Sequence, residues 1–505
     1  MVDGPETIEQ GDEKDSSSHD EQGRRTSVVL DVAPVMITDR WHVGHLKFDV
    51  LSDDVLLYIF DAYQRRSRQP AYEWAYAFEN DPGWPWHTMV HVCQRWRRLI
   101  FAWPNHLEVR VECKSRTAVA KALDIWPALP ISIQSNLDHE DGGDVIAALE
   151  HRERIAWIKL LDLSGPRLEK CVSLMQGPFP ILRCLSLDCD ANDVLVLTDA
   201  FLAGSASHLQ LLRLSGVPFP TLPKLLLSAS KLVHIDLNDI TSAGYVSPEA
   251  MATCLATLKS LRSLVIKFQS DSSFLDRTSR LSPPPTRGVL PGLSSFTITG
   301  VSEYLEDLIA RIDTPQLNFF SPQFFYQPIF DIPQLPQFIH RAEKLKLPHH
   351  ARIEFCEDAV VISLTSREDG NSALRFYCTG LYRQLSLLVH SLPLLSRIDT
   401  LELASCSPLL YGRHMPWLDF LRIFDAVKAL HVDYEQLEMQ FVIATALAEI
   451  ALEETEEVLP MLQIIVGRFD LEEFEMMRPF LHARSESGHP VEVMMWLPVP
   501  SPDQD

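Results

Sequence analysis

The sequence lacks the features that mark membrane-spanning, disulfide-rich and nucleic-acid-binding proteins. No uninterrupted apolar run in its 505 residues is long enough to cross a bilayer. Its nine cysteines include no Cys-x-x-Cys pair, and the closest two, Cys184 and Cys189, stand apart from the others. Basic residues number 45 against 68 acidic ones, and the net charge of −23 repels phosphate groups. We therefore expect a cytoplasmic or nuclear protein, in a reducing compartment, that binds neither membrane nor nucleic acid.

Motifs of the common enzyme families are also missing. The sequence has no Gly-x-x-x-x-Gly-Lys phosphate loop, no Gly-x-Gly-x-x-Gly, no His-Glu-x-x-His and no Gly-x-Ser-x-Gly. His87 and His91 have the spacing of metal ligands on a helix, but no third ligand lies nearby in the sequence. Residues 188–199 begin like a calcium loop, yet Asp193 and Asp199 replace the required Gly and Glu. We expect no catalytic residue, no metal and no cofactor.

Composition divides the chain into two tails and two ordered parts. Residues 1–40 are rich in Asp, Glu, Ser, Gln and Gly and lack the basic start and apolar core of a secretory signal, so we expect a disordered acidic tail. Residues 41–105 are predicted to form a small helical domain. Because no flexible or charged linker interrupts residues 106–497, one continuous body is expected there, followed by a short tail at residues 498–505.

The segment 48–101 contains two amphipathic helices. The first can begin at Ser52 or Asp53, since both are good N-cap residues. Its apolar residues recur at helical spacing and are Val55, Leu56, Ile59, Phe60 and Tyr63. The second helix, over residues 86–101, has an apolar stripe of Met89, Val92, Cys93, Trp96, Leu99 and Ile100, with the solvated Arg95, Arg97 and Arg98 beside it. About 50 residues is near the lower size limit for independent folding, so the rest of the chain or another protein should cover part of this surface.

These two helices resemble the F-box, in particular the F-box-like domain of a large fungal protein family. The matching segments are Leu51-x-Asp53-Asp54-Val55-Leu56-Leu57-x-Ile59-Phe60 and Val90-x-Val92-Cys93-x-Arg95-Trp96-Arg97-x-Leu99-Ile100. The resemblance implies binding to the Skp-type adaptor of a cullin-RING ubiquitin ligase. The residues that it assigns to this contact are Leu51, Val55, Leu56, Ile59, Phe60, Val92, Cys93, Trp96 and Ile100. The chain departs from the usual pattern in two places, because Leu51-Ser52 replaces the common Leu-Pro and residues 64–85 form an insertion between the helices.

From about residue 107 the chain repeats a Leu-x-x-Leu-x-Leu pattern. The first copies start at Ile155, Leu182, Leu209, Leu232, Leu261 and Leu293, and their central residues are 23 to 32 positions apart. This spacing is close to the period of leucine-rich repeats. Later copies lie at residues 345–347, 398–403, 427–432 and 459–464. Helical segments are expected between them, at residues 144–153, 248–258, 304–312, 381–391, 417–425 and 443–452. Each repeat would pair one strand with one helix and bury both against its neighbours.

The repeats are irregular in three respects. The Asn or Cys that commonly follows the strand is replaced by Asp190, Val217 and Ile240, so no Asn ladder is expected. Residues 351–378 alternate with period two, which predicts extra strands. A turn at residues 487–490 leads into a last short strand that would end the solenoid.

We therefore expect an α/β protein in which an N-terminal all-helical F-box-like module precedes an irregular leucine-rich-repeat solenoid, with parallel strands inside and helices outside. Residues 304–308, 333–339 and 487–490 look like segments that follow the F-box in the same fungal family. The resemblance implies a non-catalytic substrate-recognition subunit of a Skp-cullin-F-box ubiquitin ligase that binds a protein target through the solenoid. Outward-facing positions that could contact the target are Arg183, Ser186, Arg213, His234, Asp236, Arg262 and Lys267.

A second hypothesis is a leucine-rich-repeat interaction scaffold outside any ligase, in which the first 105 residues only cap the solenoid. The two hypotheses differ in the exposure of Val55, Ile59, Phe60 and Trp96. An adaptor-binding module leaves part of this cluster exposed, whereas a cap buries it on the strand near residues 107–111. A third hypothesis, an enzyme built on an unfamiliar solenoid, has no residue pattern in its favour.

Overall fold

A computed structural model describes most of the chain. The described residues are 51–67, 86–104, 106–107, 109–114, 119–126, 128–136, 143–163, 165–189, 196–269, 286–325, 331–345, 348–356, 359–366, 372–379, 382–405, 417–432, 437–452 and 458–495. The predicted tails, most of the insertion at 64–85 and residues 190–195 of the calcium-like loop lie outside these residues. Internal contacts divide the chain into residues 1–56 and residues 57–505, and each unit is described by itself.

The helix α1 (Asp53–Ser67) begins in the first unit and continues in the second, and Ser52, one of the two predicted N-caps, caps it. Its Oγ accepts a hydrogen bond from the backbone N–H of Val55 at 3.3 Å, and its carbonyl accepts one from the N–H of Leu56 at 3.1 Å. Asp53 and Asp54 occupy the first turn, where the helix dipole stabilises negative charge. The sequence therefore specifies the start of α1 locally.

The single helix expected over residues 86–101 is two helices, α2 (Trp86–Val90) and α3 (Gln94–Ala102). The break occurs because Cys93 is in extended conformation, and its Sγ accepts from the N–H of Trp96 as the N-cap of α3. Arg97 fixes the corner between the two helices, since its Nε donates to the carbonyl of Val90 at 3.0 Å. An aromatic cluster of Trp86, Phe101 and Trp126 then joins α2 and α3 to the rest of the second unit.

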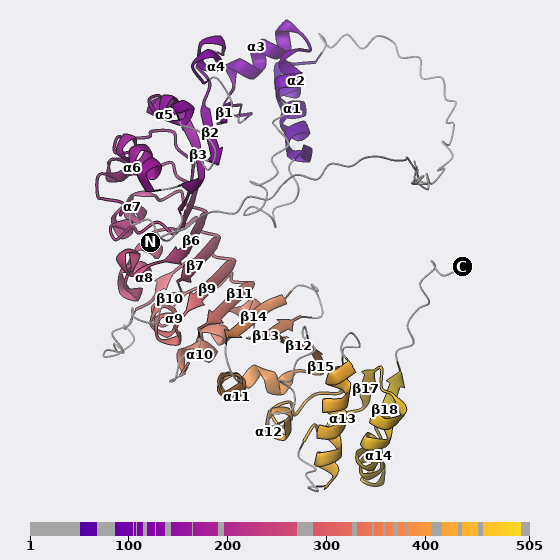
Figure 1. Cartoon of the computed structure of the whole chain (residues 1–505). Coiled ribbons are helices and arrows are strands. Elements are labelled where there is room, and N and C mark those ends of the chain that lie inside the picture. Colours follow the sequence, from indigo (N-terminus) through magenta and orange to yellow (C-terminus); the bar gives the residue numbers. More distant parts are fainter. Residues whose placement is uncertain are drawn as a thin grey trace, which may run out of the picture. The chain divides into compact units, whose positions relative to one another are not determined.

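Within the described residues, the structure has 14 α-helices and one large sheet of 16 strands (Figure 1). In sheet order the strands are β1 (Val111–Lys114), β2 (Ile131–Asn136), β3 (Ile155–Leu163), β4 (Cys184–Cys189), β5 (Leu211–Ser215), β6 (His234–Ile240), β7 (Ser263–Phe268), β9 (Ser295–Gly300), β11 (Phe319–Phe324), β14 (Ser372–Thr379), β13 (Ala359–Thr365), β12 (His350–Phe355), β15 (Thr400–Ser405), β16 (Ala429–Val432), β17 (Ile464–Gly467) and β18 (Glu492–Met495). All neighbours pair in parallel except β13. A separate two-stranded sheet pairs β8 (Gly288–Val289) with β10 (Ile312–Asp313).

The central residues of the predicted repeats form one buried row across the sheet. Ile158, Leu185, Leu212, Ile235 and Leu264 lie in register on consecutive strands, and each is almost completely buried. Alternate residues of a strand point to opposite faces, so the apolar positions of the pattern all face one side. The predicted strands in this part of the chain are confirmed.

Helices cover the face of the sheet to which this buried row points. They are α4 (Val119–Ile125), α5 (Gly143–Leu149), α6 (Gly165–Leu174), α7 (Leu222–Ser228), α8 (Pro248–Leu255), α9 (Ser302–Ile309), α10 (Gln334–Arg341), α11 (Tyr382–Ser391), α12 (Trp417–Leu421), α13 (Leu437–Leu452) and α14 (Leu471–Glu486). Consecutive helices touch one another, for example α7 with α8, α8 with α9, and α9 with α10 (Figure 1). Each connection between parallel strands therefore adds to a continuous helical layer.

The extra strands predicted near residues 351–378 are confirmed and interrupt the parallel order. β13 is antiparallel to both β12 and β14, and these two pair in parallel with β15 and β11 respectively. Because β14 and not β12 pairs with β11, the three strands β12, β13 and β14 occur in reverse order in the sheet. The last predicted strand is also confirmed, since β18 pairs in parallel with β17.

In the part of the chain that the structure describes, no helix has both the length and the apolar composition needed to span a membrane.

Candidate partner-binding surface

The outer side of α1 is apolar where a surface helix is normally polar. Tyr58 is 72% exposed, Ile59 41% and Tyr63 51%, and Ala62 is exposed beside them. Their spacing of one, three and one residues places them on one side of the helix. Phe60 points to the opposite side, where it is buried and its ring contacts Trp96 edge-on at 4.7 Å between centroids. The helix therefore has two apolar sides, of which the rest of the chain covers one.

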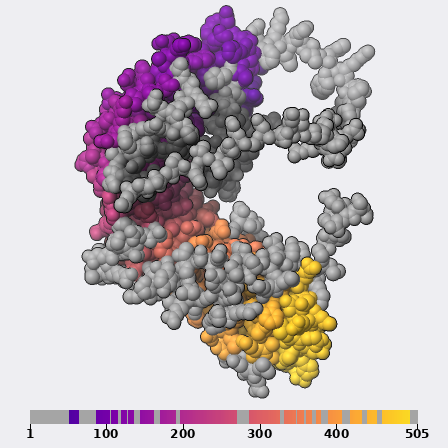
Figure 2. Space-filling view, in the orientation of Figure 1, coloured from indigo at the N-terminus to yellow at the C-terminus, as the bar shows by residue number. Residues whose placement is uncertain are grey.

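Further apolar side chains are exposed at both ends of α3. Val92 lies in the turn before the helix, and Trp103 follows its last residue; both are more than half exposed. The contact between Phe60 and Trp96 holds α1 and α3 side by side. We call the exposed residues Tyr58, Ile59, Tyr63, Val92 and Trp103 the apolar surface of α1 and α3; their segments are drawn in indigo in Figures 1 and 2.

The nine residues predicted to contact an adaptor differ in their accessibility. Val55, Ile59, Val92 and Cys93 are exposed, and Leu51 and Trp96 are half-buried. Leu56, Phe60 and Ile100 are buried, so these three stabilise the helices in this structure. Sequence reasoning missed Tyr58 and Trp103 and left Tyr63 out of the contact set. The signal for Tyr58 was its position three residues after Val55 and one before Ile59, which continues the helical stripe.

The open face of the sheet carries the predicted target-facing residues of the strands. Arg213 on β5 and Asp236 on β6 are paired in register, with 3.4 Å between Nε and Oδ2. Asn238 donates a hydrogen bond to the other carboxylate oxygen of Asp236 at 2.7 Å. Burial raises the pKa of Asp236, and Arg213 opposes this effect. Ser186 is buried, whereas Lys267 is half-buried at the end of β7. Arg213 and Asp236 therefore neutralise each other in the free protein.

Arg183 and Arg262 occupy a different position from the other target-facing candidates. They immediately precede β4 and β7 and have the same strand phase as the buried residues. They therefore lie at the amino-terminal ends of these strands and not in the open face of the sheet. His234 is half-buried at the start of β6, where burial lowers its pKa, with a smaller contribution from the charge of Arg262.

A second charged network lies on β12 and β15. Arg352 bridges Glu354 and Glu402, and the Nε2 atom of His350 lies 3.2 Å from the other carboxylate oxygen of Glu402. The hydrogen bond from His350 lowers the pKa of Glu402, and the charge of Arg352 acts in the same direction. His431 of β16 is next to Glu402 in the register. The open face thus presents charges that are paired with each other on β5 and β6 and again on β12 and β15.

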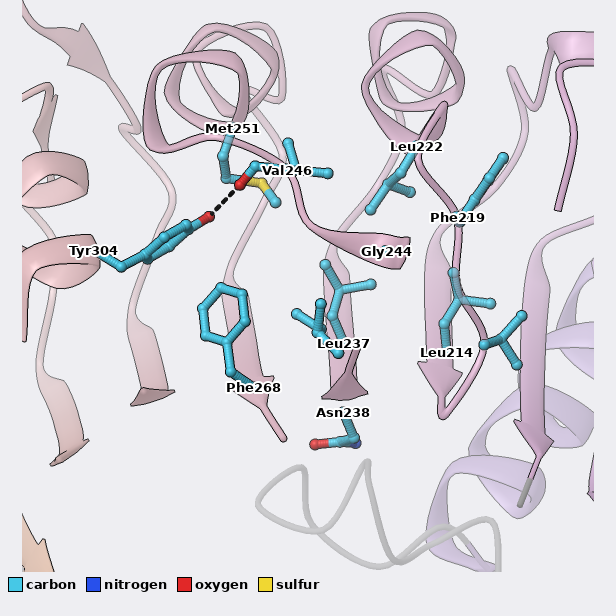
Figure 3. A pocket seen from close by; sticks show the side chains of 12 residues that line it. Leu214, Phe219, Leu222, Leu237, Asn238, Gly244, Val246, Met251, Phe268 and Tyr304 are labelled. Carbon is cyan, nitrogen blue, oxygen red and sulfur yellow. Dashed lines mark hydrogen bonds between the residues drawn. The ribbon is translucent and has the colours of Figure 1, made fainter. Parts of the chain in front are cut away.

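A small cavity lies near the carboxyl ends of β5, β6 and β7 (Figure 3). Leu214, Leu237 and Phe268 line it from the strands, and the hydroxyl of Tyr304 donates a hydrogen bond to the carbonyl of Val246 at 3.1 Å beside it. The cavity offers about 20 Å³ of space. This is room for roughly one water molecule, so we regard the cavity as a packing defect of the interior.

The polar motifs singled out in the sequence form no recognisable site among the described residues. Cys184 and Cys189 are both buried and form no disulfide, and burial raises the pKa of Cys184 to about 12. His91 is exposed in the turn after α2, and the side chain of His87 lies outside the described set. Among the residues that the structure describes, no group of three or more His, Cys, Asp or Glu side chains is arranged to hold a metal ion.

Compared with known proteins, the chain matches no family model and no curated protein sequence.

Proposed function

We propose that this chain is a substrate-recognition subunit of a Skp-cullin-F-box ubiquitin ligase. In this proposal α1, α2 and α3 act as an F-box-like module that docks on the Skp-type adaptor. The sheet and its helices act as a leucine-rich-repeat-like solenoid that binds a protein target through the open face. The chain itself needs no catalytic residue, because the ligase brings the target close to a ubiquitin-charged enzyme.

The observation that carries the proposal is the exposed apolar side of α1. Leaving Tyr58, Ile59 and Tyr63 in water forgoes a favourable transfer of roughly 25 cal/mol for each square ångström of apolar area. A monomeric protein usually places charged residues on such a helix face. Grouped apolar side chains that stay exposed are typical of a protein-binding surface.

The repeat architecture supports the second half of the proposal. Strands joined by outer helices leave one sheet face open over many repeats, and such faces are used for extended protein contacts. The polar and charged residues of this face, such as Arg213, Asp236 and Glu402, are available to exchange their internal pairings for contacts with a target.

The alternative function is an interaction scaffold in which α2 and α3 only cap the solenoid. The aromatic cluster of Trp86, Phe101 and Trp126 favours it, because it buries part of these helices against the segment after α4. This cluster does not cover Tyr58, Ile59 or Tyr63, which a cap has no reason to keep apolar.

The test is capture of a purified Skp-type adaptor by the full chain and by the variant Ile59→Asp. A carboxylate at the centre of an apolar interface is strongly unfavourable, so we expect at least about 30-fold weaker binding, or roughly 2 kcal/mol. The matched control is Ile125→Asp, the same substitution at an exposed residue near the end of α4, where Ile125 is 74% exposed. We expect this control to bind like the wild type.

Both substituted side chains are exposed, so circular dichroism and thermal melting should show that the two variants stay folded. Absence of adaptor binding by the wild-type chain, or equal binding by Ile59→Asp and Ile125→Asp, contradicts the ligase proposal and favours the scaffold.

A further inference from the structure

We propose that Arg97 and Arg98 form a cationic rim beside the apolar surface of α1 and α3, and that the protein surface they meet is acidic. This inference rests on the proposed function, because the partner is the adaptor that α1 contacts. It adds the charge of that partner's surface, which the apolar residues alone do not specify.

Neither arginine has an anionic partner among the described residues. Arg97 and Arg98 are exposed on the outer side of α3. The Nε of Arg97 is occupied by the carbonyl of Val90, which holds the base of its guanidinium against α2 and leaves its charge unneutralised. Arg98 makes no hydrogen bond or ion pair with any described residue. The two side chains are therefore available for carboxylates of a partner.

The position of these charges is unfavourable for the free protein. α3 contains three arginines and no acidic residue, and Arg95 is its second residue. The partial positive charge at a helix N-terminus is stabilised by acidic side chains and opposed by basic ones. In a chain with 68 acidic and 45 basic residues, two neighbouring arginines, Arg97 and Arg98, without an anionic partner among the described residues need a separate explanation. An acidic partner supplies it.

The chain's overall charge makes a local cationic rim useful. A net charge of −23 repels an acidic protein at long range. Arginines next to the contact surface make the electrostatic potential positive at that surface, because the field of a charge extends about 10 Å at 0.1 M salt. Val92 and Trp103, at the two ends of α3, place apolar contacts on either side of the arginines. Arginine and aromatic residues are both enriched in protein interfaces, so this combination of side chains fits a contact surface.

The inference is tested by the rate at which the full chain associates with the purified adaptor, followed by stopped-flow fluorescence at several salt concentrations. Arg98→Gln should slow association roughly two- to threefold at low salt, and Arg98→Glu should slow it more. Arg98→Lys keeps the charge and should restore the rate. The matched control is Arg397→Gln at another exposed arginine, which changes the net charge by the same amount.

The possible outcomes separate the inference from the function on which it rests. Association rates of Arg98→Gln that equal those of Arg397→Gln at every salt concentration overturn the cationic rim and leave the ligase proposal intact. Failure of the wild-type chain to bind the adaptor overturns both. If the wild-type chain binds a single-stranded oligonucleotide and Arg98→Gln does not, while the adaptor rates stay equal, the arginines serve nucleic-acid binding and the inference is wrong.

Discussion

Replacing Glu306 by glutamine should destabilise the first turn of α10, although Glu306 and α10 are far apart in sequence. Glu306 lies on α9, is only 5% exposed, and accepts hydrogen bonds from the backbone N–H groups of Gln334 at 2.6 Å and Leu335 at 2.9 Å. The N-cap of α10 is Pro333, whose side chain has no acceptor. The Glu306 carboxylate of the neighbouring helix α9 therefore caps the N-terminus of α10.

The magnitude follows from these two contacts. A hydrogen bond to a charged group contributes about 1.5 to 3 kcal/mol, and a negative charge at a helix N-terminus adds up to about 1 kcal/mol. Glutamine keeps one acceptor oxygen, loses the charge and brings an NH₂ group toward two N–H donors. We expect Glu306→Gln to lower the free energy of local opening by about 2 kcal/mol, which corresponds to roughly 30-fold faster amide exchange.

Hydrogen exchange with mass spectrometry measures this locally, which matters because a long repeat array does not unfold in one step. Amide exchange in the peptide that covers residues 331–341 should be faster in Glu306→Gln than in the wild type. It should equal the wild-type rate in the control Glu343→Gln, because Glu343 is an exposed glutamate just after α10. Equal protection of this peptide in both variants would refute the capping role of Glu306.

Three further changes test the second unit. Tyr304→Phe removes the buried hydrogen bond to Val246 and should destabilise the protein by about 1 to 2 kcal/mol, measured by urea unfolding followed by fluorescence. Ala203→Gly should raise stability by roughly 0.5 to 1 kcal/mol, because Ala203 has a φ of 54° that glycine adopts without strain. The control Ala200→Gly, at a φ of −76°, should lower stability. A higher melting temperature for Ala200→Gly than for Ala203→Gly would contradict this. Burial lowers the folded-state pKa of His431 below 6.5, so the unfolded chain binds the proton more readily and stability falls as the pH drops below about 6.5. Urea midpoints at pH 7.5 and 5.5 should show a smaller fall for His431→Gln than for the wild type.

The strands of the sheet were largely predictable because their signal is local. In the copies centred on Leu185, Leu212 and Ile235, apolar residues two apart must face the same side of a strand, and a parallel sheet with a helical cover buries that side. The first two strands carry only a short version of the pattern: the strand expected near residues 107–111 lies at Val111–Lys114 as β1, and β2 was not recognised.

Several helices could not be predicted because their stabilisation comes from neighbours. α14 contains Pro479 in its interior, which a sequence rule treats as a helix breaker. The structure keeps the helix through a capping box between Asp470 and Glu473 and through the buried Met477 and Phe480. α10 depends on Glu306. For α10 the decisive partner is 28 residues before the helix, whereas the capping box of α14 is local and only the burial of Met477 and Phe480 depends on the fold.

The candidate surface was predicted in part for a related reason. The spacing of Ile59, Phe60 and Tyr63 indicates a helix with much apolar surface, but it does not decide which side faces the protein. That choice depends on where Trp96 packs, and Trp96 is 36 residues after Phe60. The structure buries Phe60 and leaves Ile59 and Tyr63 exposed.

The missing Asn ladder also has a structural counterpart that single repeats do not reveal. Arginine side chains reach back by about one repeat and donate to backbone carbonyls there: Arg154 to Leu129 at 3.0 Å, Arg341 to Ile309 at 3.0 Å and Arg484 to Pro460 at 2.8 Å. Leu129 and Pro460 lie in connections that lead into a strand, and Ile309 is the last residue of α9, so all three carbonyls lie where regular secondary structure ends. Because each bond joins residues 24 to 32 positions apart, it ties one repeat to the preceding one. An Asn ladder satisfies such groups with a short side chain at a fixed position, whereas a long arginine tolerates repeats of unequal length. We infer that the arginine contacts permit the drift in repeat spacing that makes the sequence pattern irregular.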